Sequence, residues 1–184
     1  MKIIEALKEA DIAAFKFINI TLHNEPLSFM MRFTANDLFL IDLLTAGLGF
    51  MVKKFGKKER ADTAFALWSI IAAHALNSNV LKVFFNRRRP YLDVEGANLL
   101  VALKRHGLAF PSTHTAMAAA FAAALWDNKA ARPYLAAFVL FVAFFCVYTG
   151  GHYPLDTLAG FFVGVVIGRT MNFIKKLYLK KSGN

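Results

Sequence analysis

Three short segments of the chain bring together residue types that could transfer a phosphate group. They are residues 82–90 (KVFFNRRRP), 111–114 (PSTH) and 152–156 (HYPLD). Together they supply fixed cations, a hydroxyl, two imidazoles and a carboxylate, which suits holding a phosphate and moving it onto a histidine. Each segment lies at the end of an apolar stretch that could cross or nearly cross a bilayer. Because polar groups at membrane depth are costly, this cluster predicts a functional site.

The first segment places two cations on one face of a helix. Lys82 and Arg89 are seven residues apart, about two helical turns. Pro90 disfavours helical geometry at the residue before it, so we expect the helix to end at Arg89. A lysine near a membrane interface often does no more than reach the headgroups, and for Lys82 alone that alternative stays open.

The second segment predicts the start of a helix. Pro111 suits the first turn of a helix and Ser112 suits its cap. The unpaired N–H groups of a helix N-terminus also form a ready cradle for a phosphate, to which the Ser112 hydroxyl would add a donor. One arrangement can serve both purposes, so capping and phosphate binding are both retained.

The third segment pairs an imidazole with a carboxylate at the start of another helix. His152 and Asp156 are four residues apart, with Pro154 between them. A carboxylate at that distance can accept a hydrogen bond from one ring nitrogen, which fixes the tautomer and leaves the other nitrogen as a nucleophile. The plainer alternative is an interfacial histidine beside a helix-start aspartate.

No spacing of the remaining histidines resembles a metal site. His74 lies within an apolar stretch, where it more simply bonds another helix, and His23 and His106 fall in loops. The carboxylates are scattered rather than grouped as zinc or magnesium would require. The sequence therefore predicts chemistry without a metal ion or other cofactor.

The composition favours an integral membrane protein. Of the 184 residues, 57% are hydrophobic and 18% are charged, and the apolar residues form long runs. The net charge of +10 suits anionic lipid headgroups and an anionic substrate. Nucleic acid is excluded as a partner because the cations lie between apolar runs and not on a basic face. Cys146 is the one cysteine, so no internal disulfide can form.

The apolar runs predict an all-α, polytopic membrane bundle of about five transmembrane helices in a single domain, 1–184. An amphipathic helix over 2–22, within a segment 1–26, is expected to lie in the membrane interface. The helical core covers 27–174 and a basic tail covers 175–184. The predicted spans are about 38–52, with a possible start near 27, then 63–85, 111–126, 133–148 and 155–173.

Alternation of these spans places the three segments on one side of the membrane. The segment before the first span and the loops 86–110 and 149–156 share that side, whereas the basic loops 53–60 and 127–132 and the tail lie opposite. Eleven Lys and Arg residues fall on the opposite side and nine on the side of the three segments. The excess predicts that the three segments face away from the cytoplasm.

Glycines every four residues predict a close contact between the last span and the third. Such small residues let two helices approach closely, which would bring His114 and His152 together. The glycines are Gly160, Gly164 and Gly168, and the expected partners are Ala116, Ala119, Ala120, Ala123 and Ala124.

The three segments resemble the signature of the type-2 phosphatidic acid phosphatase superfamily, which comprises membrane lipid phosphatases and soluble vanadium haloperoxidases. Its pattern is K-x6-R-P, then P-S-G-H, then S-R-x5-H-x3-D. The resemblance covers about residues 82–156, and the hydropathy of the chain argues against a haloperoxidase. The matching residues are Lys82, Arg89, Pro90, Pro111, Ser112, His114, His152 and Asp156.

The resemblance implies a role for each residue. His152 would attack phosphorus to form a phosphohistidine, Asp156 would orient it, and His114 would protonate the departing oxygen. The transition state would be stabilised by Lys82, Arg89, Ser112 and the backbone N–H of Thr113. Water would then hydrolyse the intermediate.

Two positions depart from the pattern. Thr113 replaces the glycine of the second motif, which adds bulk but keeps the backbone donor. Phe145 and Cys146 stand where the third motif has Ser-Arg, so a phosphate-binding arginine is missing. Losing one such contact could weaken phosphate binding by roughly 1.5–3 kcal/mol. The candidates for a compensating cation are Arg87, Arg88, Lys104 and Arg105.

The resemblance implies a metal-independent phosphatase of a bacterial-type inner (plasma) membrane that acts on a lipid phosphate, first of all undecaprenyl diphosphate. Phosphatidylglycerol phosphate, phosphatidic acid and lipid A remain open as substrates, as does transfer of the phosphate to a lipid alcohol. The rival from another class is a non-catalytic protein that binds or transports lipid phosphates, which the cysteine at position 146 favours. The oligomeric state is not predicted.

Overall fold

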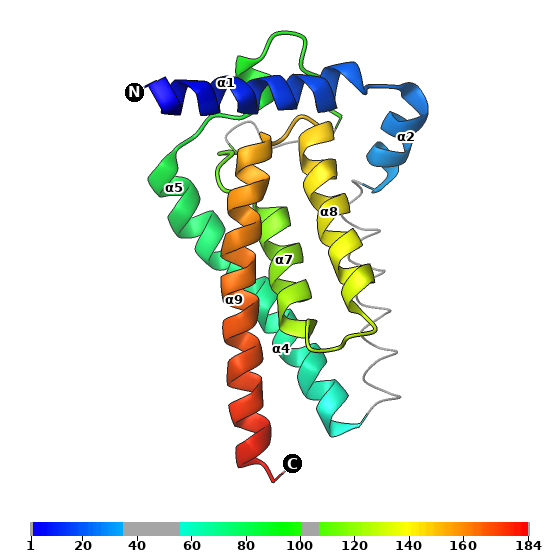
Figure 1. The fold of residues 1–184 in the computed structure, drawn as a ribbon, viewed down its shortest axis with the longest axis vertical. Helices are drawn as coiled ribbons and strands as arrows, with labels where there is room; N and C mark the ends of the chain where they lie inside the picture. Colours follow the sequence, from blue (N-terminus) through cyan, green and yellow to red (C-terminus); the bar gives the residue numbers. More distant parts are fainter. Residues whose placement is uncertain (1, 35–55, 101–106, 184) are drawn as a thin grey trace.

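The computed structural model describes residues 2–34, 56–100 and 107–183, which form helices and no strands (Figure 1). The all-helical class predicted from the sequence is therefore confirmed for the described residues. The helices are α1 (Lys2–Lys16), the π-helical η1 (Phe17–Thr21), α2 (Glu25–Thr34), α4 (Lys57–Leu76), the π-helical η2 (Asn77–Leu81), α5 (Lys82–Phe85), α6 (Pro90–Asp93), α7 (Thr113–Leu125), α8 (Arg132–Tyr148) and α9 (Pro154–Lys181).

Helix α7 is the centre of a bundle in which it packs against α4, α8 and α9. Seven of its alanines are buried, and these short side chains let the surrounding helices approach. Large apolar side chains point outward instead: Leu140 is 70% exposed and Val166 is 66% exposed. Small residues inside and large apolar residues outside are what a bundle surrounded by lipid requires, because lipid tails are as apolar as the side chains they contact.

Two described stretches are long and apolar enough to cross a membrane, Lys58–Asp93 and Pro154–Lys181. The predicted third and fourth spans are the shorter apolar helices α7 and α8, of 13 and 17 residues. The predicted first span, 38–52, lies outside the described residues. The count of five spans therefore stays a prediction.

Two predicted boundaries are wrong because charged residues extend the helices. The predicted basic loop 53–60 is helical from Lys57 onward, since Gly56 caps α4 and Lys, Glu and Arg are good helix formers. The last helix continues to Lys181, through most of the segment predicted as a basic tail. Lys175 is buried there and forms an ion pair with Asp62 of α4.

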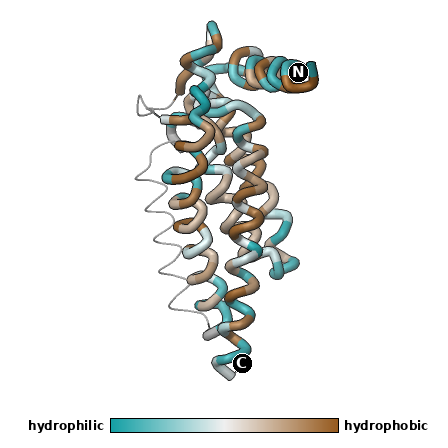
Figure 2. The backbone as a smooth tube through the Cα atoms, turned by 90° about the vertical axis from the view of Figure 1, so that its left-hand side faces the viewer, coloured by the Kyte–Doolittle hydropathy of each residue, from teal (hydrophilic) through white to brown (hydrophobic). Residues whose placement is uncertain are grey.

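The N-terminal helix predicted over 2–22 ends at Thr21, and a second helix, α2, starts at Glu25. Figure 1 shows α1 lying across one end of the bundle, and Figure 2 shows hydrophilic and hydrophobic residues alternating along it. Asp11 and Phe15 are nevertheless buried, and the Phe15 ring packs 5.5 Å from that of Tyr153. The helix is thus attached to the bundle by specific contacts.

The predicted close contact between the third and last spans is confirmed. A Cβ atom added at Gly164 would lie 2.2 Å from the Ala116 carbonyl oxygen, and one added at Gly168 would lie 2.2 Å from that of Ala120. At the N-terminal ends of the same two helices, the Ser112 N–H donates to the Asp156 carbonyl oxygen at 2.9 Å. The glycines therefore hold the second and third segments side by side.

Candidate active site

His152 and Asp156 form a buried pair where α8 passes into α9. Their side chains are 3% and 0% exposed, and His152 Nδ1 lies 3.7 Å from Asp156 Oδ2. This distance is too long for the predicted hydrogen bond. Both carboxylate oxygens have other partners, because Oδ2 accepts the Tyr153 N–H at 2.8 Å and Oδ1 accepts from Arg87. Among the described residues His152 Nδ1 has no hydrogen-bond partner.

Burial determines the charge of His152. It lowers the pKa of the imidazole to about 4, although the neighbouring Asp156 carboxylate acts in the opposite direction. The ring is therefore neutral at physiological pH, which is the form that can attack an electrophile.

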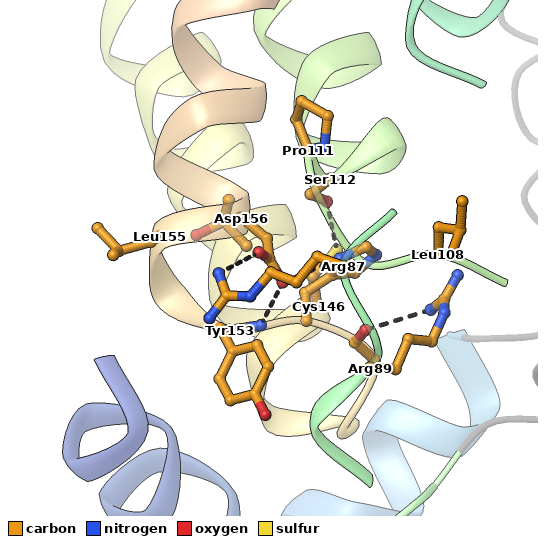
Figure 3. A network of polar contacts seen from close by, with 12 residues as sticks. Arg87, Arg89, Leu108, Pro111, Ser112, Cys146, Tyr153, Leu155 and Asp156 are labelled. Atoms are coloured by element: carbon orange, nitrogen blue, oxygen red, sulfur yellow. Dashed lines mark hydrogen bonds and ion pairs between the residues drawn. The ribbon is translucent and has the colours of Figure 1, made fainter. Parts of the chain in front are cut away.

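Arg87 joins Asp156 to the N-terminal helix. Its guanidinium donates to Asp156 Oδ1 at 2.6 Å (Figure 3). It also donates to Asp11 Oδ2 at 2.6 Å. The same guanidinium lies over the Tyr153 ring, 4.1 Å from its centroid. Arg87 thus contacts two carboxylates, and it does not serve as the free compensating cation that the sequence suggested.

Lys82 and Arg89 hold two neighbouring carbonyl groups. Lys82 Nζ donates to Leu108 O at 2.8 Å, and Arg89 Nε donates to Gly107 O at 2.9 Å. Arg89 Nη1 also reaches Gly151 O, next to His152, at 3.2 Å. These bonds use part of the eight N–H donors on the two side chains. The predicted helix end at Arg89 is wrong: α5 ends at Phe85, because Asn86 adopts a left-handed conformation with φ of 46°, so Lys82 and Arg89 do not share a helix face. The non-helical residues 86–89 nevertheless bring the two cations to neighbouring carbonyl groups beside His152.

Gly107 permits this arrangement because it has no side chain. A Cβ atom there would lie 2.7 Å from Arg89 Nη2.

Ser112 is the N-cap of α7, as predicted. Its Oγ accepts from the Thr115 N–H at 3.4 Å and from the Thr115 hydroxyl at 3.0 Å. Cys146 is buried beside it, with Sγ 3.7 Å from Ser112 Oγ. The position that has an arginine in the family pattern therefore faces the Ser112 hydroxyl from α8.

The π-helical turn η2 supports the second segment through Asn77. The Asn77 side-chain amide donates to Pro111 O and to Thr113 Oγ1, both at 2.9 Å. Thr113 is thus fixed by its side chain, a contact that the glycine of the family pattern could not make. A single π-turn within a helix is frequent at functional sites.

The other predicted residues are placed as follows. His114 is exposed in the first turn of α7. Arg88 is 67% exposed and pairs with Asp93 at 3.2 Å, so it is engaged outside the pair of cations. Lys104 and Arg105 lie outside the described residues.

An apolar groove of about 910 Å³ begins beside this site and runs between α7, α8 and α9. Thr115 lines it at the end near Ser112, and Pro154 and Leu155 line it at the end near Asp156. Small residues create the space, because alanines supply much of the lining on α7 and α8. The lining is Thr115, Ala119, Ala122, Ala123, Trp126, Ala136, Val139, Leu140, Ala143, Pro154, Leu155, Thr157, Leu158, Phe161, Val165 and Arg169.

Sequence reasoning missed Asp11 and Asn77 and gave Arg87 a different role. A signal for Asp11 was present, because Asp11, Phe15 and Ile18 follow one another at intervals of four and three residues. That spacing puts a carboxylate on the apolar face of the first helix, where an unpaired charge would be costly. Nothing local in the sequence marks Asn77, whose partners are 34 and 36 residues away.

Comparison with known proteins finds a family whose model covers the range that contains the three segments. Residues 62–178 match the model of the PAP2 superfamily. The fold is similar to that of Aquifex aeolicus LpxE, with 24% identity and a TM-score of 0.63 over 85% of this chain and 91% of the other. It is also similar to a transmembrane PAP2-type phosphatidylglycerolphosphate phosphatase from Bacillus subtilis, with 24% identity and a TM-score of 0.68 over 96% of this chain and 87% of the other. No curated protein sequence matches the chain.

Proposed function

Because the chain belongs to the PAP2 superfamily, we propose that it is an integral membrane lipid phosphatase acting through a phosphohistidine, without a metal ion. One observation carries the proposal. Two cations, a helix N-terminus and a buried neutral histidine lie at the same end of the bundle, where an apolar groove begins. A phosphate and a hydrocarbon chain joined in one molecule match that arrangement.

The reaction proceeds by two displacements at phosphorus. His152 Nε2 attacks phosphorus, the bond to the leaving oxygen breaks, and His114 gives that oxygen a proton. Water then attacks the phosphohistidine, His114 takes the proton from the water, and the phosphorus–nitrogen bond breaks to regenerate neutral His152. Asp156 stabilises the positive charge that develops on the imidazole.

Phosphate binding rests on the groups at the end of α7 and on the two cations. In the proposed mechanism the Thr113 N–H and the Ser112 hydroxyl, which donates to Cys146 Sγ at 3.7 Å in this structure, bind the phosphate at the helix N-terminus, where the helix dipole favours negative charge. Lys82 and Arg89 lie beside Gly107, Leu108 and Gly151 and add charge that counters the charge of the transition state.

Metal independence is supported by the side chains themselves. Within residues 2–34, 56–100 and 107–183, no group of three or more His, Cys, Asp or Glu is placed to hold a metal ion. Phosphate release should therefore continue in excess EDTA. An enzyme that loses activity in EDTA and regains it with magnesium would contradict this part of the proposal.

The groove supports a lipid as the substrate. It starts at the residues that flank the catalytic segments, so a phosphate held at Ser112 would place its hydrocarbon chain in the groove. A volume of about 910 Å³ lies near the top of the range of ligand pockets, roughly 300–1,000 Å³. The first substrate we propose is undecaprenyl diphosphate, presented from the outer face of a bacterial-type inner membrane.

Phosphatidylglycerol phosphate is the second candidate, favoured by the structural similarity to the Bacillus subtilis phosphatase. Phosphatidic acid and lipid A phosphates are further members of the same class. A non-catalytic lipid-phosphate binding protein is the alternative from another class. It is favoured by Cys146, which is buried against Ser112 where the family pattern supplies a cation.

The deciding experiment measures phosphate release by the purified protein in detergent. The panel contains undecaprenyl diphosphate, phosphatidylglycerol phosphate, phosphatidic acid and lipid A diphosphate, with His152→Ala as the inactive control. We expect release from at least one lipid and loss of more than about 100-fold in His152→Ala, given that acid–base help alone is worth about 10²–10⁴. Binding of these lipids without release would favour the non-catalytic protein.

Two alanines on α8 test the groove itself. Ala136 lines the groove, whereas Ala137, its neighbour, is exposed and does not line it. Ala136→Phe should reduce turnover of a long-chain lipid phosphate more than turnover of a short-chain, water-soluble phosphate ester, and Ala137→Phe should change neither. Equal effects of the two substitutions on the long-chain substrate would mean that the groove does not hold the substrate.

A further inference from the structure

Asp11 of the N-terminal helix α1 is a buried carboxylate with its own set of partners. Its side chain is 0% exposed, and Oδ2 accepts from Arg87 Nη2 at 2.6 Å. Its Oδ1 accepts the Leu155 N–H at 2.8 Å. Asp11 therefore contacts the first turn of α9 directly and, through Arg87, the Asp156 carboxylate one residue further along.

Asp156 is held in one orientation by two hydrogen bonds, one to each carboxylate oxygen. Arg87 binds its Oδ1 and the Tyr153 N–H binds its Oδ2, so the second oxygen is left facing His152 Nδ1 at 3.7 Å. If Arg87 moved, Oδ1 would lose a charge-assisted hydrogen bond and the carboxylate could rotate about its side-chain bond. The position of Asp156 relative to His152 thus depends on Arg87.

The position of Arg87 depends in turn on α1. The guanidinium has one carboxylate on each side, Asp11 and Asp156, and the Tyr153 ring covers its face. Phe15, one turn after Asp11, packs against that same ring. Helix α1 therefore contributes both a charge and a packing surface to the segment that carries His152 and Asp156.

We propose that Asp11 and Arg87 are positioning residues, which hold Asp156 in place behind His152 and make α1 part of the active site. This inference rests on the proposed function. Neither residue touches the phosphate. Their effect is on the orientation of the imidazole during attack, where a misplacement of about 1 Å can cost up to about 10²-fold in rate.

The test compares Asp11→Asn with two matched controls. Asp62→Asn neutralises a half-buried carboxylate that pairs with the buried Lys175, toward the opposite end of α9. Glu9→Gln removes a charge from the exposed surface of α1. Turnover of the lipid that the wild-type protein hydrolyses fastest is measured in one detergent, together with the melting temperature of every variant.

We expect Asp11→Asn to lower kcat about 10- to 100-fold with KM within about twofold, because binding of the phosphate is untouched. Asp62→Asn should lower the melting temperature but keep kcat, and Glu9→Gln should change neither. If Asp11→Asn lowers kcat no more than Asp62→Asn does, Asp11 is only a structural residue and the proposal fails. A wild-type protein that releases no phosphate would instead overturn the proposed function.

Arg87→Lys supplies a second test that does not depend on Asp11→Asn folding well. A lysine keeps the charge but cannot bridge two carboxylates with a planar fork. Both substitutions break the same chain of contacts from Asp11 through Arg87 to Asp156. The double variant Asp11→Asn/Arg87→Lys should therefore have a kcat no lower than that of the slower single variant. Losses that multiply in the double variant would show that the two residues act independently and would contradict the proposal.

Discussion

Replacing Cys146 with arginine restores the residue that the family pattern has at this position, and the structure allows its effect to be worked out. Cys146 Sγ lies 3.7 Å from Ser112 Oγ, and the side chain is buried. An arginine there would extend toward the phosphate that we propose binds at Ser112. One charge-assisted hydrogen bond contributes roughly 1.5–3 kcal/mol, which corresponds to a change of about 10- to 100-fold in Kd.

The same substitution has a cost when no anion is bound. An unpaired buried charge destabilises a protein by about 3–5 kcal/mol, and Arg89 and Lys82 already supply positive charge to this site. Cys146→Arg should therefore melt at a lower temperature than the wild-type protein in the absence of anion. Saturating phosphate should close most of that difference, because ligand binding stabilises the folded state.

The assay is a titration of the melting temperature with inorganic phosphate and with vanadate. Cys146→Met is the control, since it lengthens the side chain without adding charge. We expect Cys146→Arg to bind both anions about 10- to 100-fold more tightly than Cys146→Met. Equal affinities of the two variants would refute the inference that this position faces the phosphate.

Three further predictions follow from the packing and the charges. Gly164→Ala should destabilise the bundle by about 1–3 kcal/mol and lower activity, because its Cβ would lie 2.2 Å from the Ala116 carbonyl oxygen. The control is Thr170→Ala, on the exposed side of α9. Equal melting temperatures of the two variants would contradict the close contact between α9 and α7. Burial lowers the pKa of His152 from 6.5 to about 4, so the unfolded chain binds the proton more tightly than the folded protein does. The melting temperature should therefore fall as pH drops from 6.5 toward 4. If His152→Gln shows the same pH dependence of the melting temperature as the wild-type protein, this prediction is wrong. Lys175→Met should lower the melting temperature without changing kcat, because Lys175 pairs with Asp62 far from His152; a loss of kcat at unchanged stability would show that this pair has a functional role.

The sequence was sufficient for those parts of the fold that local patterns determine. Helices α7 and α8 begin and end within two residues of the predicted spans, because proline and polar turns interrupt the apolar runs at both ends. The glycines of α9 predicted its contact with α7, since small residues at four-residue intervals form one helix face that lets another helix approach closely.

What the sequence could not supply is the choice of partner among charged residues. Arg87, Arg88 and Arg89 are adjacent, yet Arg87 joins two buried carboxylates, Arg88 pairs with Asp93 at the surface, and Arg89 holds backbone carbonyl groups. Their destinations depend on tertiary packing, because Asp11 and Asp156 lie 76 and 69 residues away from Arg87. The same packing fixes the His152 to Asp156 distance, which spacing alone predicted to be a hydrogen bond.

The most direct measurement is to trap the covalent intermediate. Wild-type protein is mixed with undecaprenyl diphosphate or phosphatidylglycerol phosphate, denatured at alkaline pH within a turnover, and digested for mass spectrometry. We expect a phosphate on His152, in a bond that survives alkali and is lost in mild acid. We also expect less of this phosphohistidine at early times in Asp11→Asn. Phosphate release from the lipid with no phosphate on His152, or with phosphate on another residue, would show that His152 is not the nucleophile.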